Sequence, residues 1–141
     1  MTLEDAVVLA VRAHQGQKDK AGESYILHPL RVMLKQDTEI GMMAAVLHDV
    51  VEDTSWTFDG LRDQGCSEDV LALIDQLTRR DGEEYSDYLA RIRTDPTARS
   101  VKLADLEDNL NVLRLRQITP KDADRLNKYL DAWRDLQGDP A

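Results

Sequence analysis

The chain has 141 residues, of which 42% are hydrophobic and 32% charged, and its formal net charge is −9. This length predicts one domain with a core of its own, and we expect a single domain over residues 1–141. The acidic charge argues against a nucleic-acid partner, because proteins of that class usually present a basic patch or stripe. Cys66 is the only cysteine, so no intrachain disulfide can form and a reducing compartment fits.

The first residues also indicate the cellular compartment of the protein. Glu4 and Asp5 stand where a secretory signal peptide needs positive charge. No apolar run approaches the roughly 18 residues of a membrane-spanning helix. We therefore expect a cytoplasmic protein that has no membrane partner.

Helical spacing of apolar residues recurs along the whole chain, and strict alternation typical of strands does not. An opening helix is expected over 3–14, and a polar loop over 15–24 leads to a short helix over 27–34. Residues 40–52 are the most apolar segment, which predicts one central, buried helix. Further helices are expected over 56–64, 67–79, 85–93 and 96–115 and from Thr119 onward. The predicted fold is all-α, a compact bundle of seven to eight helices.

The central helix ends in polar residues that a buried segment should not carry. They are His48, Asp49, Glu52 and Asp53. Unpaired buried carboxylates are very costly, and a divalent metal would compensate them, since imidazole and carboxylate are good ligands. A single His-Asp pair would more often be the solvated end of a helix.

Two further features strengthen the metal hypothesis. Asp105 lies inside the apolar stretch 101–106, and Asn109 follows one helical turn later. His28 immediately precedes Pro29 at a boundary between loop and helix, where a side chain can point into a cleft. His14 lies on the apolar stripe of the first helix, so we interpret it as a packing residue or one that supports the site from behind.

Several segments carry a resemblance to a known family. They read AHQGQ at 13–17, YILHP at 25–29, HDVVEDT at 48–54, LTRR at 77–80 and VKLAD at 101–105. The pattern resembles the H…HD…D signature of the HD superfamily of metal-dependent phosphohydrolases. It is more closely similar to the hydrolase domain of RelA/SpoT-like alarmone enzymes of the stringent response and to their small single-domain relatives.

The resemblance implies specific roles. His28, His48, Asp49 and Asp105 would bind the metal, typically manganese in the alarmone branch. Glu52 and Asp53 match the pair that assists the nucleophilic water, and Asn109 matches a residue near the substrate. The implied reaction removes pyrophosphate from the 3′ position of guanosine tetra- or pentaphosphate.

The chain departs from the alarmone pattern at two places. Asp19-Lys20-Ala21 stands where these hydrolases usually carry an Arg-Lys pair, and Leu106-Glu107-Asp108-Asn109 stands where they read Arg-Leu-His-Asn. Asp19, Glu107 and Asp108 are therefore expected to disfavour a highly charged substrate.

Substrate contacts are expected from Lys20, Arg114 and Asn109. The other basic residues near the presumed cleft are interpreted as solvated surface charges; they are Lys18, Arg79, Arg80 and Lys102. Tyr129 and Trp133, on the apolar stripe of the last helix, are expected in the core.

Three functions remain open from the sequence. The favoured one is a phosphohydrolase acting on a small phosphorylated nucleotide, either an alarmone or another nucleotide or phosphomonoester. The second is a metal- or nucleotide-binding regulatory module without turnover, which the loss of a ligand or of the Glu52-Asp53 pair would indicate. The third is a helical interaction domain, which would require both groups of buried acids to be accidental.

Overall fold

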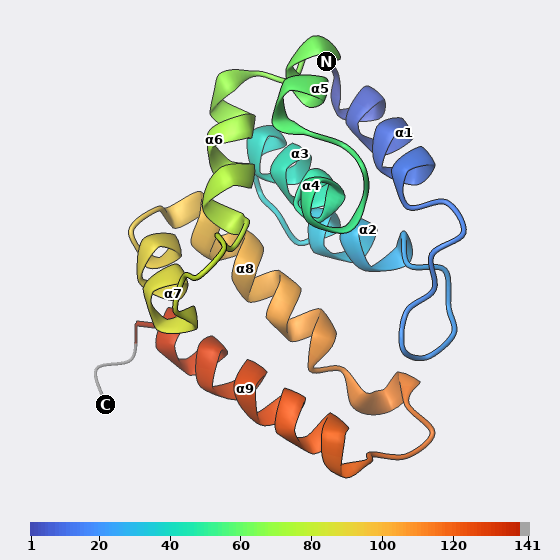
Figure 1. Ribbon diagram of the computed structural model, residues 1–141, viewed down its shortest axis with the longest axis vertical. Helices are drawn as coiled ribbons and strands as arrows, with labels where there is room; N and C mark the ends of the chain where they lie inside the picture. The colour runs from blue at the N-terminus through green and yellow to red at the C-terminus, as the bar shows by residue number, and fades with distance from the viewer. Residues whose placement is uncertain (139–141) are drawn as a thin grey trace.

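Helices account for nearly all the regular structure of this chain (Figure 1). The computed structural model describes residues 1–138, in which nine α-helices and one 3₁₀-helix occur. They are α1 (Leu3–Ala13), α2 (Leu27–Leu34), α3 (Glu39–Leu47), α4 (Val50–Asp53), α5 (Phe58–Asp63), α6 (Glu68–Leu77), α7 (Tyr85–Arg93), α8 (Pro96–Asn109), η1 (Val112–Arg114) and α9 (Pro120–Leu136). The predicted all-α class is confirmed. The expectation of one domain over 1–141 stays a prediction, since residues 139–141 lie outside the described part.

Side-chain caps explain where several helices begin. Thr2 and Thr119 each form a capping box with the acid three residues later, which starts α1 and α9. Ser67 caps α6 as its position predicted, by accepting from the Val70 N–H. Asp95 caps α8 just ahead of Pro96, whose missing N–H costs nothing at that position.

Helix α3 lies at the centre of the fold. It packs against α1, α2, α6 and α8, and its residues from Met43 to Leu47 are all buried. A helix this apolar on every side has to be enclosed by other helices. Figure 1 shows α8 and α9 running side by side below this centre.

The prediction of one helix over 40–52 was wrong, because the helix breaks at His48 and Asp49. The His48 N–H reaches back only three residues, to the Ala45 carbonyl, so the last turn of α3 is tightened. The four-residue α4 then starts afresh after Asp49. The break places His48 and Asp49 at a junction between two helices.

The predicted helix over 96–115 is also shorter than expected. Helix α8 ends at Asn109, and the Asn111 side chain then accepts from the Leu113 N–H and caps the short η1. Asparagine favours such local hydrogen bonds over continued helix. Arg114 is consequently on a separate segment from Asn109.

No helix within residues 1–138 has both the length and the apolar character needed to cross a bilayer.

Candidate metal centre

Four side chains from three regions of the chain converge beside α3. His28 comes from the first turn of α2, His48 and Asp49 from the junction between α3 and α4, and Asp105 from α8. His28 Nε2 lies 2.8 Å from Asp105 Oδ1 and 3.8 Å from Asp49 Oδ2. His48 Nε2 lies 3.1 Å from Asp49 Oδ2 and 3.5 Å from Asp105 Oδ1. The structure thus brings the four predicted ligands together, and their role as ligands stays a prediction.

Three of these residues form a compact set of possible metal ligands. One donor atom from each of His28, His48 and Asp49 can be chosen so that all lie within 4.8 Å of one another. Asp105 adjoins this set through its contacts with both imidazoles.

Hydrogen bonds orient the His48 ring toward the acids. Its Nδ1 donates to the Ala45 carbonyl at 2.5 Å, because a carbonyl can only accept. In the neutral ring Nε2 then carries a lone pair, and this atom is buried without a hydrogen-bond partner of its own. A neutral imidazole fixed in this way is prepared to bind a metal through Nε2.

The His28 ring is oriented in the same sense. Its Nδ1 donates to Asp108 Oδ2 at 2.6 Å, and its Nε2 faces Asp105. Burial opposes the charged ring, but the hydrogen bonds with Asp105 and Asp108 raise the pKa of His28 to about 9.

This donor set fits a divalent cation. Two imidazole nitrogens and two carboxylates, all buried or nearly so, lie close together. Their lone pairs would repel one another unless a proton or a cation lies between them. Such nitrogen and oxygen ligands suit Mn, Fe, Co and Zn. Asp105 is further stabilised by Lys102, whose Nζ lies 2.9 Å from Asp105 Oδ2. Lys102 is thus a partner of the site, and its interpretation as a solvated surface charge was wrong.

The two acids of α4 lie one turn beyond the ligands. Partial desolvation and the negative charge of Asp49 raise the pKa of both Glu52 and Asp53. Tyr25 connects Asp53 to the ligand cluster, because its hydroxyl donates to Asp49 Oδ2 at 2.5 Å and lies 3.5 Å from Asp53 Oδ2. Carboxylates with raised pKa values are suited to accept a proton.

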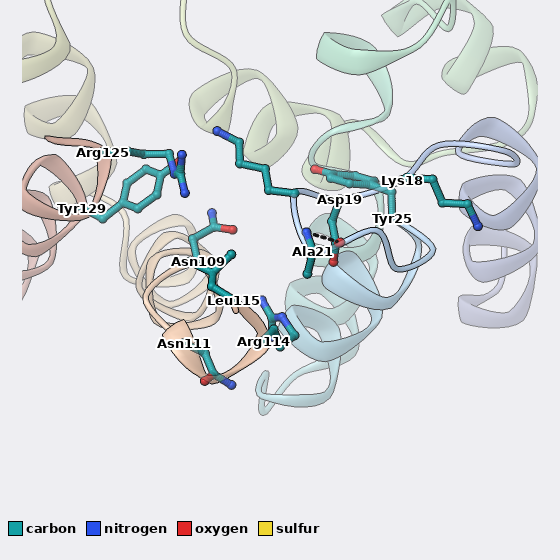
Figure 2. Close-up of a pocket in the computed structure, with 11 residues that line it drawn as sticks. Lys18, Asp19, Ala21, Tyr25, Asn109, Asn111, Arg114, Leu115, Arg125 and Tyr129 are labelled. Atoms are coloured by element: carbon teal, nitrogen blue, oxygen red, sulfur yellow. Dashed lines mark hydrogen bonds between the residues drawn. The ribbon is translucent and has the colours of Figure 1, made fainter. Parts of the chain in front are cut away.

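A cavity of about 370 Å³ opens beside this centre (Figure 2). Tyr25 and Asn109 belong both to its lining and to the centre, since Asn109 Nδ2 donates to Asp105 Oδ1 at 3.4 Å. Lys20 and Arg114 also line the cavity, so the three predicted substrate contacts share one pocket. Part of the Arg114 guanidinium is already engaged, because it bonds the Asp108 carboxylate and carbonyl.

Helix α9 supplies pocket residues that the sequence reasoning missed. Figure 2 shows Arg125 and Tyr129 on α9, facing across the pocket toward the loop that holds Asp19 and Ala21. Tyr129 and Trp133 both pack against the core as expected, and Tyr129 also lines the pocket. The helical spacing of 125 and 129 was a signal that these side chains share a face.

The three acids expected to repel a polyanion form hydrogen bonds or ion pairs with other groups of the protein. Asp19 Oδ1 accepts the backbone N–H groups of Ala21 and Glu23, each at 2.9 Å, and so closes its own loop. Glu107 pairs with Lys35 and Trp133, and it does not line this pocket.

Asp108 is buried against His28, Arg31 and Arg114 and is also absent from the pocket lining. Glu107 and Asp108 thus lie outside the pocket lining, and the expectation that these acids disfavour a charged substrate stays a prediction. For Asp19, two backbone N–H groups offset the carboxylate charge.

His14 is connected to the backbone of α4 through Gln17. It is buried, and its Nδ1 lies 2.9 Å from Gln17 Oε1. Gln17 Nε2 in turn donates to the Asp53 carbonyl at 3.1 Å. His14 is outside the compact set of possible metal ligands and braces the backbone of α4.

Comparison with known proteins identifies the family. A family model described as an HD domain matches residues 6–104. The chain is 34% identical to the guanosine-3′,5′-bis(diphosphate) 3′-pyrophosphohydrolase of Aquifex aeolicus, with 79% of this chain and 18% of that protein covered. It is 32% identical to the bifunctional (p)ppGpp synthase/hydrolase SpoT of Escherichia coli, with 79% and 18% covered. The chain therefore spans less than a fifth of the length of these curated relatives.

A solved structure shows the same fold. It is that of a metazoan ortholog of SpoT, described as hydrolysing ppGpp and playing a role in starvation responses. The match has a TM-score of 0.78 and 25% sequence identity, and it covers 95% of this chain and 84% of that one. HD domains bind divalent metals, and the four donors described above are the residues that fit this property. On the match over residues 6–104 and this shared fold, the chain belongs to the HD-domain family.

Proposed function

We propose that this chain is a metal-dependent phosphohydrolase that removes pyrophosphate from the 3′ position of guanosine tetra- or pentaphosphate. The observation that carries the proposal is the junction of two features, a buried His-Asp cluster that fits a divalent cation and a pocket lined by cationic side chains. The relatives named for this reaction support the choice of substrate. We further propose that residues 1–141 are a single catalytic domain and that it acts in the cytoplasm.

The ligands in this proposal are His28, His48, Asp49 and Asp105, and the proposed metal is Mn²⁺. A bound divalent ion would lower the pKa of a water and polarise a phosphoryl oxygen. Glu52 and Asp53 take the proton from the attacking water, which their raised pKa values favour.

The pocket offers positive charge for the phosphates. Burial lowers the pKa of Lys20, and the neighbouring positive charges of Arg125 and Lys121 lower it further, so these cations converge. A polyanionic ligand would relieve their mutual repulsion and gain charge-assisted hydrogen bonds. Lys20, Arg125 and Arg114 are the proposed phosphate contacts, and Asn109 and Tyr129 are placed to contact the nucleoside.

The experiment is product analysis with the Mn²⁺-loaded protein. Guanosine tetraphosphate and ordinary nucleoside mono-, di- and triphosphates are assayed side by side for phosphate and pyrophosphate. We expect pyrophosphate and guanosine 5′-diphosphate from guanosine tetraphosphate alone. Release only from other nucleotides would contradict the assigned substrate, and no release by a protein shown to hold metal would favour the regulatory module.

A further inference from the structure

Asp108 is a buried acid that the proposed chemistry does not use. It lies on α8, one turn after Asp105, and is only 5% exposed. Its Oδ2 accepts the His28 Nδ1–H at 2.6 Å, and its Oδ1 accepts Arg31 Nε at 2.7 Å. Arg31 Nη2 and Arg114 Nη1 complete the set at 3.1 and 3.4 Å. A buried carboxylate with this many donors is held in one place.

The hydrogen bond to His28 has a chemical consequence. An ionised carboxylate can only accept, so the proton of the His28 ring on that side must sit on Nδ1. The opposite nitrogen, Nε2, faces Asp49 and Asp105 and is the ring nitrogen left to bind a metal. The Ala45 carbonyl likewise requires the proton of His48 to sit on Nδ1, so different acceptors hold both rings in the same tautomer.

The two arginines explain why Asp108 stays ionised in the interior. Arg31 belongs to α2, one turn after His28, and binds the carboxylate through two nitrogens. Arg114 approaches from η1 and also bonds the Asp108 carbonyl at 3.0 Å. Without these charges, burial of the carboxylate would be too costly.

We propose that Asp108 is a positioning residue for the metal centre, which fixes the tautomer and orientation of His28 and is itself clamped by Arg31 and Arg114. The inference rests on the proposed metal site. Acceptors behind a metal-bound histidine are worth about 10- to 100-fold in metal affinity. Arg114 accordingly serves the metal centre as well as the pocket.

The test is a calorimetric titration of Mn²⁺ into metal-free wild-type protein and into Asp108→Asn. Asparagine has the same shape, but its amide replaces one acceptor oxygen with an NH2 group, which must face either the His28 Nδ1–H or the Arg31 Nε and Arg114 Nη1 donors. We expect the two charged arginines to take the remaining oxygen, which leaves the NH2 group against His28. We expect the dissociation constant for Mn²⁺ to rise about 10- to 100-fold. The matched control is Glu107→Gln on the same helix, whose side chain contacts Lys35 and Trp133 and should leave the affinity unchanged.

Two further readouts keep the outcome decisive. In the protein loaded with diamagnetic Zn²⁺, NMR should show a hydrogen-bonded Nδ1–H on His28 that Asp108→Asn loses. Should Asp108→Asn fail to fold, Arg31→Lys keeps the charge but breaks the two-nitrogen clamp, and it should also weaken Mn²⁺ binding. Unchanged affinity and an unchanged His28 signal in a folded variant would overturn the role of Asp108. A wild-type protein that binds no Mn²⁺ would instead overturn the metal site itself.

Discussion

The chemistry of single residues depends on which partner each polar atom has. Glu52 lies beyond the ligand cluster, with a pKa raised by partial desolvation and by the charge of Asp49. Its proposed task is to accept a proton, which requires a carboxylate, whereas the proposed metal ligands are other side chains. Glu52 can therefore be tested separately from metal binding.

We predict that Glu52→Gln lowers kcat by about 10²-fold or more and leaves the affinity for Mn²⁺ unchanged, because the amide cannot take a proton. Steady-state kinetics on guanosine tetraphosphate and a Mn²⁺ titration measure the two effects. Glu39→Gln, an exposed acid at the start of α3, is the control and should retain full activity. An undiminished kcat would remove Glu52 from the mechanism.

Lys20 is expected to act on the substrate and leave the metal untouched. We predict that Lys20→Ala raises KM about tenfold, because it removes one charge-assisted phosphate contact, while Mn²⁺ affinity stays the same. Lys35→Ala, which removes an exposed lysine outside this pocket, serves as the control. An equal KM in the two variants would contradict the pocket assignment.

His48, Asp49 and Asp105 interrupt apolar stretches and could be singled out from the sequence, and His28 was added by its place before Pro29 and by the resemblance to the HD superfamily. The same reasoning missed Asp108 and misjudged Lys102. Lys102 pairs with Asp105 three residues later, a helical spacing that could have indicated the contact, whereas the partners of Asp108 include residues far away along the chain. Asp108 meets Arg31 across 77 positions of the chain, and such pairings arise only when α2 and α8 pack together.

Among the helices, α7 contacts the segment between α6 and α7 through a partly buried ion pair. Arg91 of α7 binds both carboxylate oxygens of Glu83 at 2.8 Å. The hydrogen bond from Arg91, together with one from the Arg80 backbone, lowers the pKa of Glu83 to about 2 from its usual 4.5. The ionised carboxylate therefore stabilises the fold above pH 4.5, and that contribution is lost as the pH falls toward 2.

We predict that Glu83→Gln lowers the Tm at pH 7 and that the difference from wild type narrows progressively between about pH 4.5 and pH 2. Thermal melts over that pH range make the comparison. Glu84→Gln, which changes an exposed neighbour without a capping bond, should leave the Tm nearly unchanged. A difference that is constant with pH would argue against the ion pair.

Helix starts were predicted well, because caps such as Ser67 and Thr119 act locally. The break at His48-Asp49 could not be predicted in this way. An apolar run followed by acids is typical of one amphipathic helix, whereas in the structure both the His48 N–H and the His48 ring bond the Ala45 carbonyl at the break.

At the scale of the whole molecule, the core around α3 fixes the relative positions of the segments that carry the candidate ligands. Leu47 is fully buried and directly precedes His48. We predict that Leu47→Ala lowers the free energy of unfolding by about 2–5 kcal/mol, because it leaves a cavity that the neighbours cannot fill. Urea denaturation gives this value.

The matched control is Leu113→Ala, since Leu113 is 90% exposed. We expect this change to stay within about 0.5 kcal/mol of wild type. Similar losses in both variants would contradict the placement of the core around α3.

The most direct test of the metal centre is the metal content of the protein itself. Protein stripped with a chelator and dialysed against Mn²⁺ should retain about one ion per chain, and His48→Ala should retain none, because His48 supplies a buried ring nitrogen that faces both Asp49 and Asp105. Metal analysis after dialysis gives the stoichiometry. A wild-type chain that retains no ion, or a His48→Ala chain that binds as well as wild type, would contradict the account.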